Sequence, residues 1–163
     1  MDAGPLRFAE LHDSTPAAPL FRRKFGHPPP DYPHHIACLM RCPDGDERVA
    51  CYVHFLPHGE LLLGGGACVD NRLLRMLDAV QRRRLREGGG LYRLTLEFAL
   101  RHFAGRYDAI FGYCGDRTAE AADRAVGFVS TPHENLLVYW TRQDVGEARR
   151  AALIARAHAA GAF

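Results

Sequence analysis

Two runs of three glycines, at residues 64–66 and 88–90, constrain the fold more than any other feature of this sequence. The first run interrupts an apolar segment at residues 60–69 that has the character of a strand. Glycine weakens a strand, so it usually marks a bulge or a point where a ligand or another backbone comes very close. The second run precedes a helical pattern from Leu91, where glycines leave the first backbone N–H groups of the helix accessible to phosphate oxygens. The alternatives are a loop tip without a ligand and a plain connection between two helices.

The spacing of apolar residues predicts one domain over residues 1–163, of class α/β (α+β), with a mixed sheet and helices packed on it. The expected strands are residues 6–11, 34–42, 48–56, 60–69, 108–113, 128–130 and 136–140. The expected helices are residues 71–86, 91–103, a short one capped by Asp116 or Thr118 that ends at Ala125, and a last one through Ala159. Residues 16–25 are expected to form a helical or irregular arm. Asp144 and Glu147 form a capping-box pattern for that last helix.

Composition excludes several classes of function. A formal net charge of +2 is too small for a nucleic-acid-binding surface, so no nucleic acid is expected as a partner. The amino terminus lacks a signal-peptide pattern and no apolar run reaches about 18 residues, so we expect a cytoplasmic protein with no membrane partner.

Five cysteines spread over apolar segments indicate free buried thiols. His34, Cys38 and Cys42 share one face of a strand but lie too far apart, about 13 Å between positions four apart, to bind one metal ion.

A second pattern lies downstream, in residues 111–140, where Ala119 precedes the pair Gly127 and Phe128. With these residues and with Gly88 and Gly90, the sequence resembles the GNAT acetyltransferase superfamily, in particular its bacterial members. That family has a Q/R-x-x-G-x-G/A loop before the helix that holds the CoA pyrophosphate, and the pattern N-x-x-A-x-x-x-Y-x-x-x-G-F in a later helix. The resemblance covers roughly residues 60–140.

The resemblance implies a mixed, mostly antiparallel central sheet flanked by helices, with acetyl-CoA as co-substrate and no metal. It implies an N-acetyltransferase that transfers an acetyl group to a primary amine of a small molecule or a peptide, as a monomer or a homodimer. The residues expected to bind the cofactor are Cys68, Val69, Arg84, Arg86, Gly88, Gly89, Gly90, Leu91 and Asp116.

The sequence departs from the family pattern in three places. The first loop position falls on Leu85, although Arg84 and Arg86 flank it and either guanidinium can contact phosphate. The helix at residues 71–86 is inserted between the fourth strand and the CoA loop, as a lid or as a cover for a sheet edge. The family's Asn falls on Asp116, and its frequent general-acid Tyr falls on Asp123.

Three residues are therefore candidates for proton transfer and catalysis, namely Tyr113, Asp123 and Asp70. Tyr113 ends a strand and can replace the missing acid, since ligands gather at strand ends in α/β sheets. Asp123 is either an acid or a structural partner of an arginine such as Arg124. A backbone N–H at Cys68, Val69 or Asp70 can stabilise the oxyanion. Asp70, His54 and His58 are candidate bases, and a cysteine nucleophile at Cys68 or Cys114 is the less common alternative to a buried thiol.

Two other functions remain open at this stage. One is a GNAT-shaped module that binds CoA, or regulates through it, without transferring an acetyl group; the absent tyrosine favours it. The other is a nucleotide-binding or hydrolytic domain that shares the glycine loop.

Overall fold

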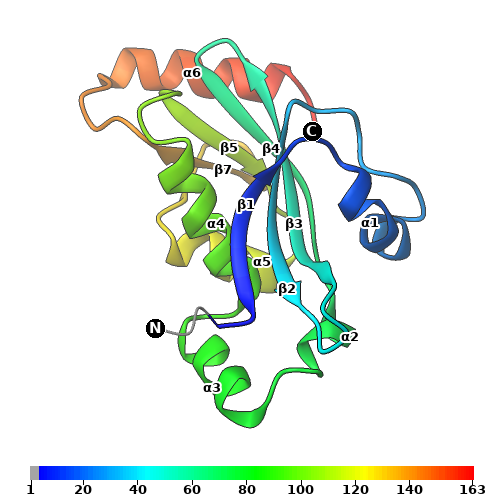
Figure 1. Ribbon diagram of the computed structural model, residues 1–163. Helices are drawn as coiled ribbons and strands as arrows, with labels where there is room; N and C mark the ends of the chain where they lie inside the picture. The colour runs from blue at the N-terminus through cyan, green and yellow to red at the C-terminus, as the bar shows by residue number, and fades with distance from the viewer. Residues whose placement is uncertain (1–3) are drawn as a thin grey trace.

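The computed structural model describes residues 4–163 and contains one sheet of seven strands in the order β1-β2-β3-β4-β5-β7-β6 (Figure 1). Its strands are β1 (Leu6–Leu11), β2 (His34–Arg41), β3 (Glu47–His58), β4 (Leu61–Val69), β5 (Ala109–Tyr113), β6 (Val129–Ser130) and β7 (Leu136–Trp140). Every neighbouring pair is antiparallel except β4 and β5, which run parallel. The prediction of a mixed, mostly antiparallel sheet is confirmed.

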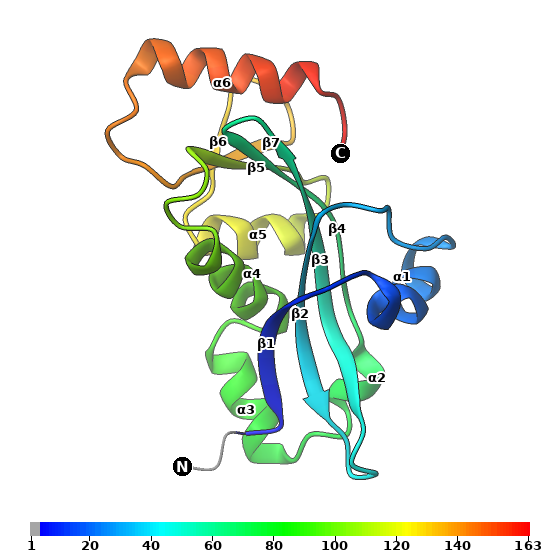
Figure 2. The same cartoon turned by 45° about the horizontal axis from the view of Figure 1, so that its top comes forward.

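The helices cover both faces of this sheet. They are the 3-10 turn η1 (Thr15–Ala17), α1 (Ala18–Phe25), α2 (Asn71–Leu74), α3 (Ala79–Glu87), α4 (Leu91–His102), α5 (Arg117–Ala125) and α6 (Glu147–Ala159). Figures 1 and 2 show α4 and α5 on one face and α1 on the other, with α6 across the end that holds β5 and β7. Successive strand residues point to opposite faces of the sheet. Leu62 and Ile110 pack toward α4 and α5, whereas Leu63 and Phe111 pack with Leu153 of α6.

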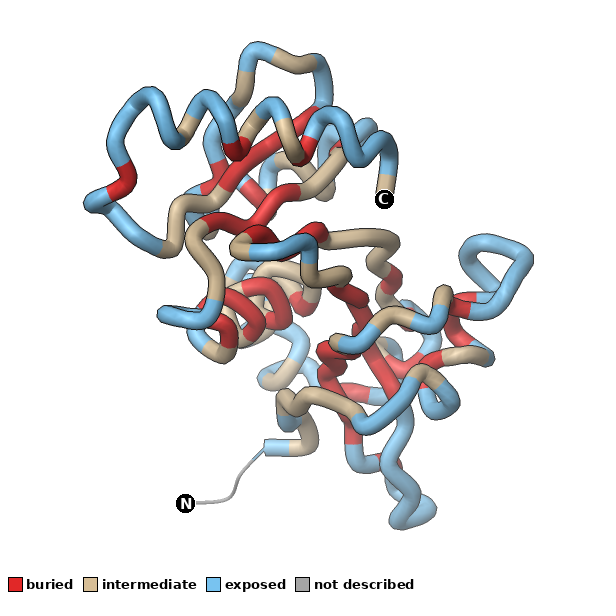
Figure 3. The backbone as a smooth tube through the Cα atoms, turned by 90° about the horizontal axis from the view of Figure 1, so that it is seen from above, coloured by how far each residue is buried: buried red, intermediate tan, exposed pale blue. Residues whose placement is uncertain are grey.

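Burial follows this layering. In Figure 3 the buried positions concentrate on the strands and on the inner turns of the helices, while the connecting loops are mostly exposed. All five cysteines are buried and free, as predicted. No helix in residues 4–163 is both long enough and apolar enough to cross a membrane.

The sheet opens between its two parallel strands. β4 pairs with β5 only from Leu61 to Gly64, opposite Ala109 to Gly112, although β4 continues to Val69. The pairing of β4 with β3 is irregular at the same point, opposite His54. A bulge at residues 64–66 is therefore present, as the glycines predicted, and it turns the second half of β4 away from β5.

Two helix predictions were wrong. The helix expected at residues 71–86 is two helices, because Asp78 starts α3 with a capping box in which Gln81 takes part. No residue of α3 is buried, and Val80 is 47% exposed. The last helix is capped by Gly146 rather than Asp144, whose carboxylate pairs with Arg142 instead.

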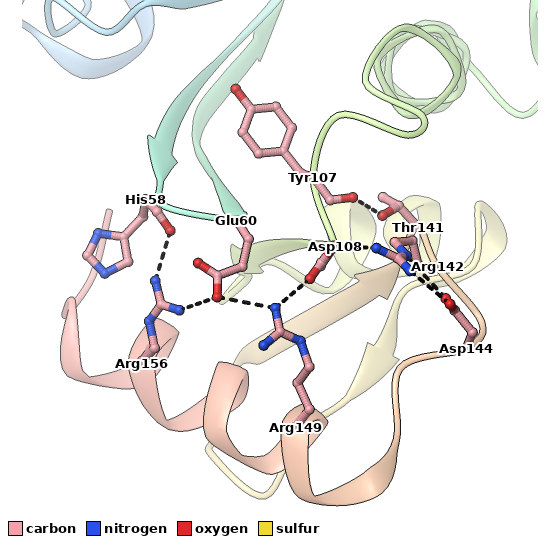
Figure 4. A network of polar contacts seen from close by, with 9 residues as sticks. All are labelled: His58, Glu60, Tyr107, Asp108, Thr141, Arg142, Asp144, Arg149 and Arg156. Carbon is pink, nitrogen blue, oxygen red and sulfur yellow. Dashed lines mark hydrogen bonds and ion pairs between the residues drawn. The ribbon is translucent and has the colours of Figure 1, made fainter.

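Arginines of α6 hold that helix to the end of the sheet (Figure 4). Arg149 bridges Glu60 at 3.3 Å and Asp108 at 2.8 Å, and Arg156 contacts Glu60 at 2.8 Å. Asp108 also contacts Arg142 at 3.6 Å. These ion pairs join α6 to residues that directly precede β4 and β5, so they fix the strand ends opposite the opening.

A second polar cluster joins β1, β2 and α4. The carboxylate of Glu10 accepts hydrogen bonds from His34 Nδ1 and His102 Nε2, both at 2.5 Å. His34 Nε2 lies 2.9 Å from the Tyr107 hydroxyl. Burial opposes the charge of Glu10, but the two histidine hydrogen bonds outweigh it, so the pKa of Glu10 lies below its ordinary value.

Replacing Glu10 by Gln is expected to lower the free energy of unfolding by about 1 to 2 kcal/mol at neutral pH, because both histidines lose a charged acceptor. A depressed pKa means that this stabilisation is present above the unfolded-state pKa of a glutamate and is lost as the pH falls through the folded-state pKa. Urea unfolding of both proteins across the acidic range measures the difference. An equal difference at every pH would contradict the role assigned to the carboxylate.

Candidate functional site

A cleft of about 830 Å³ occupies the opening between β4 and β5. It is lined by Gly64–Val69 of β4 and by the end of β5 at Tyr113, with α4 and α5 on one side of the sheet. Lys24 and Phe25 of α1 line it from the other side of the sheet. The cleft therefore reaches both faces of the sheet where the strands separate.

The amino terminus of α4 forms one wall. Gly89 and Gly90 have φ values of 87° and 92°, a conformation that favours glycine. Gly90 supplies no side-chain cap, whereas the amino termini of α2, α3 and α5 are capped by Asp70, Asp78 and Asp116. The first N–H groups of α4 and the positive end of its dipole therefore face the cleft without a capping side chain, which suits an anion.

Backbone groups of β4 form the opposite wall. The N–H of Asp70 donates to the Ala50 carbonyl at 2.8 Å, toward β3. Because successive residues of a strand direct their N–H groups to opposite edges, the N–H groups of Val69 and Ala67 point away from β3, toward the opening. β5 does not pair with β4 beyond Gly64, so these groups lie on a free strand edge in the cleft.

A buried carboxylic acid lies in the wall formed by α5. Asp123 is 7% exposed, and its Oδ1 accepts a hydrogen bond of 2.9 Å from the Tyr92 hydroxyl of α4. Burial raises the pKa of Asp123, while the hydrogen bonds from Tyr92 and Cys114 act in the opposite direction. Burial and the nearby Asp123 also raise the pKa of Tyr92, which keeps the phenol a hydrogen-bond donor. Arg124, considered as a partner from the sequence, pairs with Glu120 instead.

Tyr113 lines the cleft and contacts His158, which in turn stacks on His133. Its hydroxyl is 3.2 Å from His158 Nδ1 of α6. The ring of His158 stacks on His133 at 3.6 Å between centroids, with 7° between the planes. A hydrogen bond thus links Tyr113, which lines the cleft, to the exposed His158.

Most of the residues predicted from the sequence come together in this cleft. Those that line it are Cys68, Val69, Gly89, Gly90, Leu91, Tyr113, Cys114, Asp116 and Asp123. Asp116 uses one carboxylate oxygen to cap α5, at 2.7 Å from Thr118 N and 3.0 Å from Ala119 N. These backbone hydrogen bonds hold the pKa of Asp116 below its ordinary value. Burial raises the pKa of the Cys68 thiol to about 12 and of the Cys114 thiol to about 11, which disfavours a thiolate nucleophile.

Other predicted residues do not line the cleft. Asp70 caps α2 and pairs with Arg23, and its N–H is already bonded. Arg84 and Arg86 lie in the last turn of α3 and Gly88 ends that helix, next to the loop but outside the lining.

The two candidate histidines also lie outside the cleft lining. His54 is buried behind β4, where its Nε2 accepts the Gly66 N–H at 3.1 Å, and burial lowers its pKa to about 4. His58 is exposed at the far end of β3.

The sequence did not identify Tyr92 and Lys24, which line the cleft, or His158, which contacts Tyr113. Tyr92 had a detectable signal, because it follows the glycine run and opens a helix. Lys24 and His158 reach the site only through the tertiary arrangement of α1 and α6. Among residues 4–163, no group of three His, Cys, Asp or Glu side chains is arranged to hold a metal ion.

No family model and no curated protein matches this sequence. Solved structures do match. The ribosomal-protein-S18-alanine N-acetyltransferase from Escherichia coli aligns over 87% of this chain and 97% of its own, at 12% identity and a TM-score of 0.57. A KacTA–DNA complex aligns over 91% and 98%, at 15% identity and a TM-score of 0.54. AtaTR bound with AcCoA aligns over 94% and 99%, at 14% identity and a TM-score of 0.52. At these identities the likeness shows the fold, which is the GNAT-like fold that the sequence pattern implied.

Proposed function

We propose that this chain, which has a GNAT-like fold, is an N-acetyltransferase that transfers an acetyl group from acetyl-CoA to a primary amine. One observation carries the proposal. The sheet opens between β4 and β5, and the opening brings a free strand edge next to a helix amino terminus that no side chain caps. An extended pantetheine arm fits the strand edge and a pyrophosphate fits the helix terminus.

The residues at the two walls suit CoA. A Cβ placed on Gly90 would meet nothing within 4 Å, so the space before α4 is open to phosphate oxygens. The N–H groups of Leu91 and its neighbours would bind the pyrophosphate, with Arg84 and Arg86 close enough along the chain to add charge. The Val69 N–H would hydrogen-bond a pantetheine amide along β4, which leaves the Ala67 N–H for the thioester carbonyl.

The same arrangement supports the acetyl-transfer chemistry. The uncharged amine attacks the thioester carbon, and the carbonyl oxygen becomes an oxyanion that the Ala67 N–H stabilises. Collapse of this intermediate breaks the carbon–sulfur bond and expels the CoA thiolate, which takes a proton from the Asp123 carboxyl group. The acetylated nitrogen gives up its second proton, which returns through water to the Asp123 carboxylate and resets the acid. Asp123 stands where the family pattern has its tyrosine, and its raised pKa favours the protonated form that this step needs.

The proton of the incoming ammonium leaves at the mouth of the cleft. Tyr113 accepts it as its own hydroxyl proton passes to His158 Nδ1, and the exposed His158 returns it to solvent. In this account Tyr113 is a proton relay rather than the acid. Asp70 takes no direct part, because its carboxylate caps α2 and pairs with Arg23.

The acceptor is proposed to be a small-molecule or peptide amine. The Escherichia coli enzyme that aligns with this chain is named for an alanine of a ribosomal protein, and AtaTR was solved with AcCoA. These names support the reaction class and the acetyl donor.

Calorimetric titration with acetyl-CoA, CoA and ATP tests the proposal on the wild type and on two matched variants. Gly90→Val and Gly105→Val both place a side chain at a positive φ, at opposite ends of the α4 segment, where no atom lies within 4 Å of the new Cβ. Both should cost similar stability, but only Gly90→Val blocks the pyrophosphate. We expect it to weaken acetyl-CoA binding at least about 30-fold, the loss of one or two charge-assisted hydrogen bonds.

The outcomes separate the candidate functions. A folded wild type that binds no CoA contradicts the proposal, and so does equal weakening by both variants. Binding of CoA without acetylation of any amine in a broad screen would indicate a CoA-binding module instead. Preference for ATP over CoA would indicate a nucleotide-binding domain.

A further inference from the structure

The side of the cleft that α1 lines differs in charge from the side that α4 and α5 line. α1 packs on the opposite face of the sheet and contributes Lys24 and Phe25. If the donor occupies the α4 side, as proposed above, the amine must approach from the α1 side, since the thioester then lies in the gap between β4 and β5. The side chains of α1 are therefore placed to recognise the acceptor.

Four charged side chains line the cleft, and three of them have partners. Arg93 pairs with Glu97 at 3.0 Å, the Asp116 carboxylate accepts two backbone N–H groups, and Asp123 accepts the Tyr92 hydroxyl. Lys24 is the fourth and the only lysine of the chain. Within residues 4–163 it forms no ion pair and no side-chain hydrogen bond. The charge available to a ligand on this side is therefore positive.

Lys24 is exposed and lines the cleft, so its charge can act on residues on both sides of the opening. Burial raises the pKa of Cys68 on β4, and the positive charges of Lys24 and Arg23 act against this effect. On the other side of the opening, backbone hydrogen bonds lower the pKa of Asp116, and Lys24 adds to them. Lys24, which lines the cleft, therefore acts on groups of both β4 and the start of α5. Beside it, the Phe25 ring is 39% exposed and offers an apolar surface.

We propose that the acceptor is a primary amine that also carries a carboxylate, such as an amino acid, and that Lys24 binds this carboxylate. The inference rests on the proposed acetyltransferase function. An ammonium and a carboxylate form a charge-assisted hydrogen bond, and among the residues that the structure describes Lys24 has no competing partner. A polyamine fits poorly on the α1 side, because the two carboxylates that line the cleft, Asp116 and Asp123, belong to the start and body of α5. Phe25 contacts the carbon skeleton of the acceptor.

Steady-state acetylation assays test the proposal. One pooled panel contains amino acids, a second contains the corresponding amino acid amides, and putrescine represents the polyamines. Each amide differs from its amino acid only in the carboxylate. We expect at least one amino acid to be acetylated with a kcat/KM about 10-fold or more above that of its amide. In Lys24→Gln we expect the KM for that amino acid to rise about 10-fold while kcat changes less than about threefold, because a binding contact is lost.

Arg22→Gln is the matched control, because Arg22 is an exposed cation of α1 that does not line the cleft. It should leave both parameters unchanged. Acetyl-CoA affinity, measured by calorimetry, should be the same in the wild type and both variants. If amides or putrescine are acetylated as well as amino acids or better, the inference about the acceptor is wrong, but the acetyltransferase function stands. The same holds if Lys24→Gln keeps the preference for amino acids. Failure of the wild type to bind acetyl-CoA overturns both.

Discussion

Replacing Asp123 by Asn is expected to lower kcat for amine acetylation by about 100-fold, the usual contribution of a general acid. The amide keeps the size of the side chain and can still accept the Tyr92 hydrogen bond, but it cannot give a proton to the departing thiolate. The loss should therefore appear in kcat with little change in acetyl-CoA affinity. Stopped-flow measurement of CoA release gives both values.

The pH dependence separates an acid from a structural carboxyl group. Burial raises the pKa of Asp123, and the protonated form is the active one, so wild-type kcat should fall as the pH rises through that raised pKa. Tyr92 donates to the carboxylate and lowers its pKa. Tyr92→Phe should therefore move the fall to higher pH, and Asp123→Asn should remove it. Asp144→Asn, at an exposed acid of the α6 end, is the control.

A profile for Asp123→Asn that matches the wild type in both height and shape would contradict the role of Asp123. Tyr113→Phe would then be the next variant to measure. Suppose that Tyr113→Phe and His158→Gln lose activity equally while Asp123→Asn keeps the wild-type profile. Tyr113 and His158 would then still form the proton relay, and another group would have to be the general acid.

The second large effect is expected at the bulge of β4. A Cβ at Gly65 would lie 2.2 Å from His54 Nε2 and 2.5 Å from its Cδ2, far inside contact distance. The imidazole cannot easily move, because Tyr32, Phe21 and Tyr52 pack around it with ring centroids 4.8, 5.5 and 5.8 Å away. Gly65→Ala should lower the free energy of unfolding by about 2 to 3 kcal/mol.

Gly112→Ala is the matched control, because Gly112 stands on the neighbouring strand with no atom within 4 Å of its Cβ position. Urea unfolding should show little change for it. His54→Ala should partly compensate Gly65→Ala, so that the two changes together cost less than their sum. Strictly additive losses would show that His54 is not the group that excludes a side chain at Gly65.

Much of the fold could be predicted from local patterns. The apolar spacing placed the strands and α4 within a few residues, and the glycines at 64–66 correctly indicated a bulge. The break between α2 and α3 was missed although Asp78 and Gln81 carry a capping-box signal. The apolar residues on both sides of this break continue a helical spacing, and the spacing predicts one uninterrupted helix. At the last helix a capping-box pattern misled, because Asp144 is drawn to Arg142.

The candidate site was predictable only where one segment supplied it. The glycine loop and the helix after β5 each carry a local pattern, so Gly90, Asp116 and Asp123 could be named from the sequence. The partner of Asp123 could not, because Tyr92 belongs to a different helix and meets it only when α4 and α5 pack together. Lys24 is further removed, since α1 reaches the cleft from the opposite face of the sheet.

The central claim is that the opening between β4 and β5 binds acetyl-CoA along the free edge of β4 and at the start of α4. A titration of the 15N-labelled protein with acetyl-CoA, followed through its backbone amide signals, tests this claim most directly. We expect the largest shifts at Ala67, Val69, Gly90 and Leu91, with no shift at Glu10 or Arg149. Shifts confined to another surface, or none at millimolar acetyl-CoA, would contradict it.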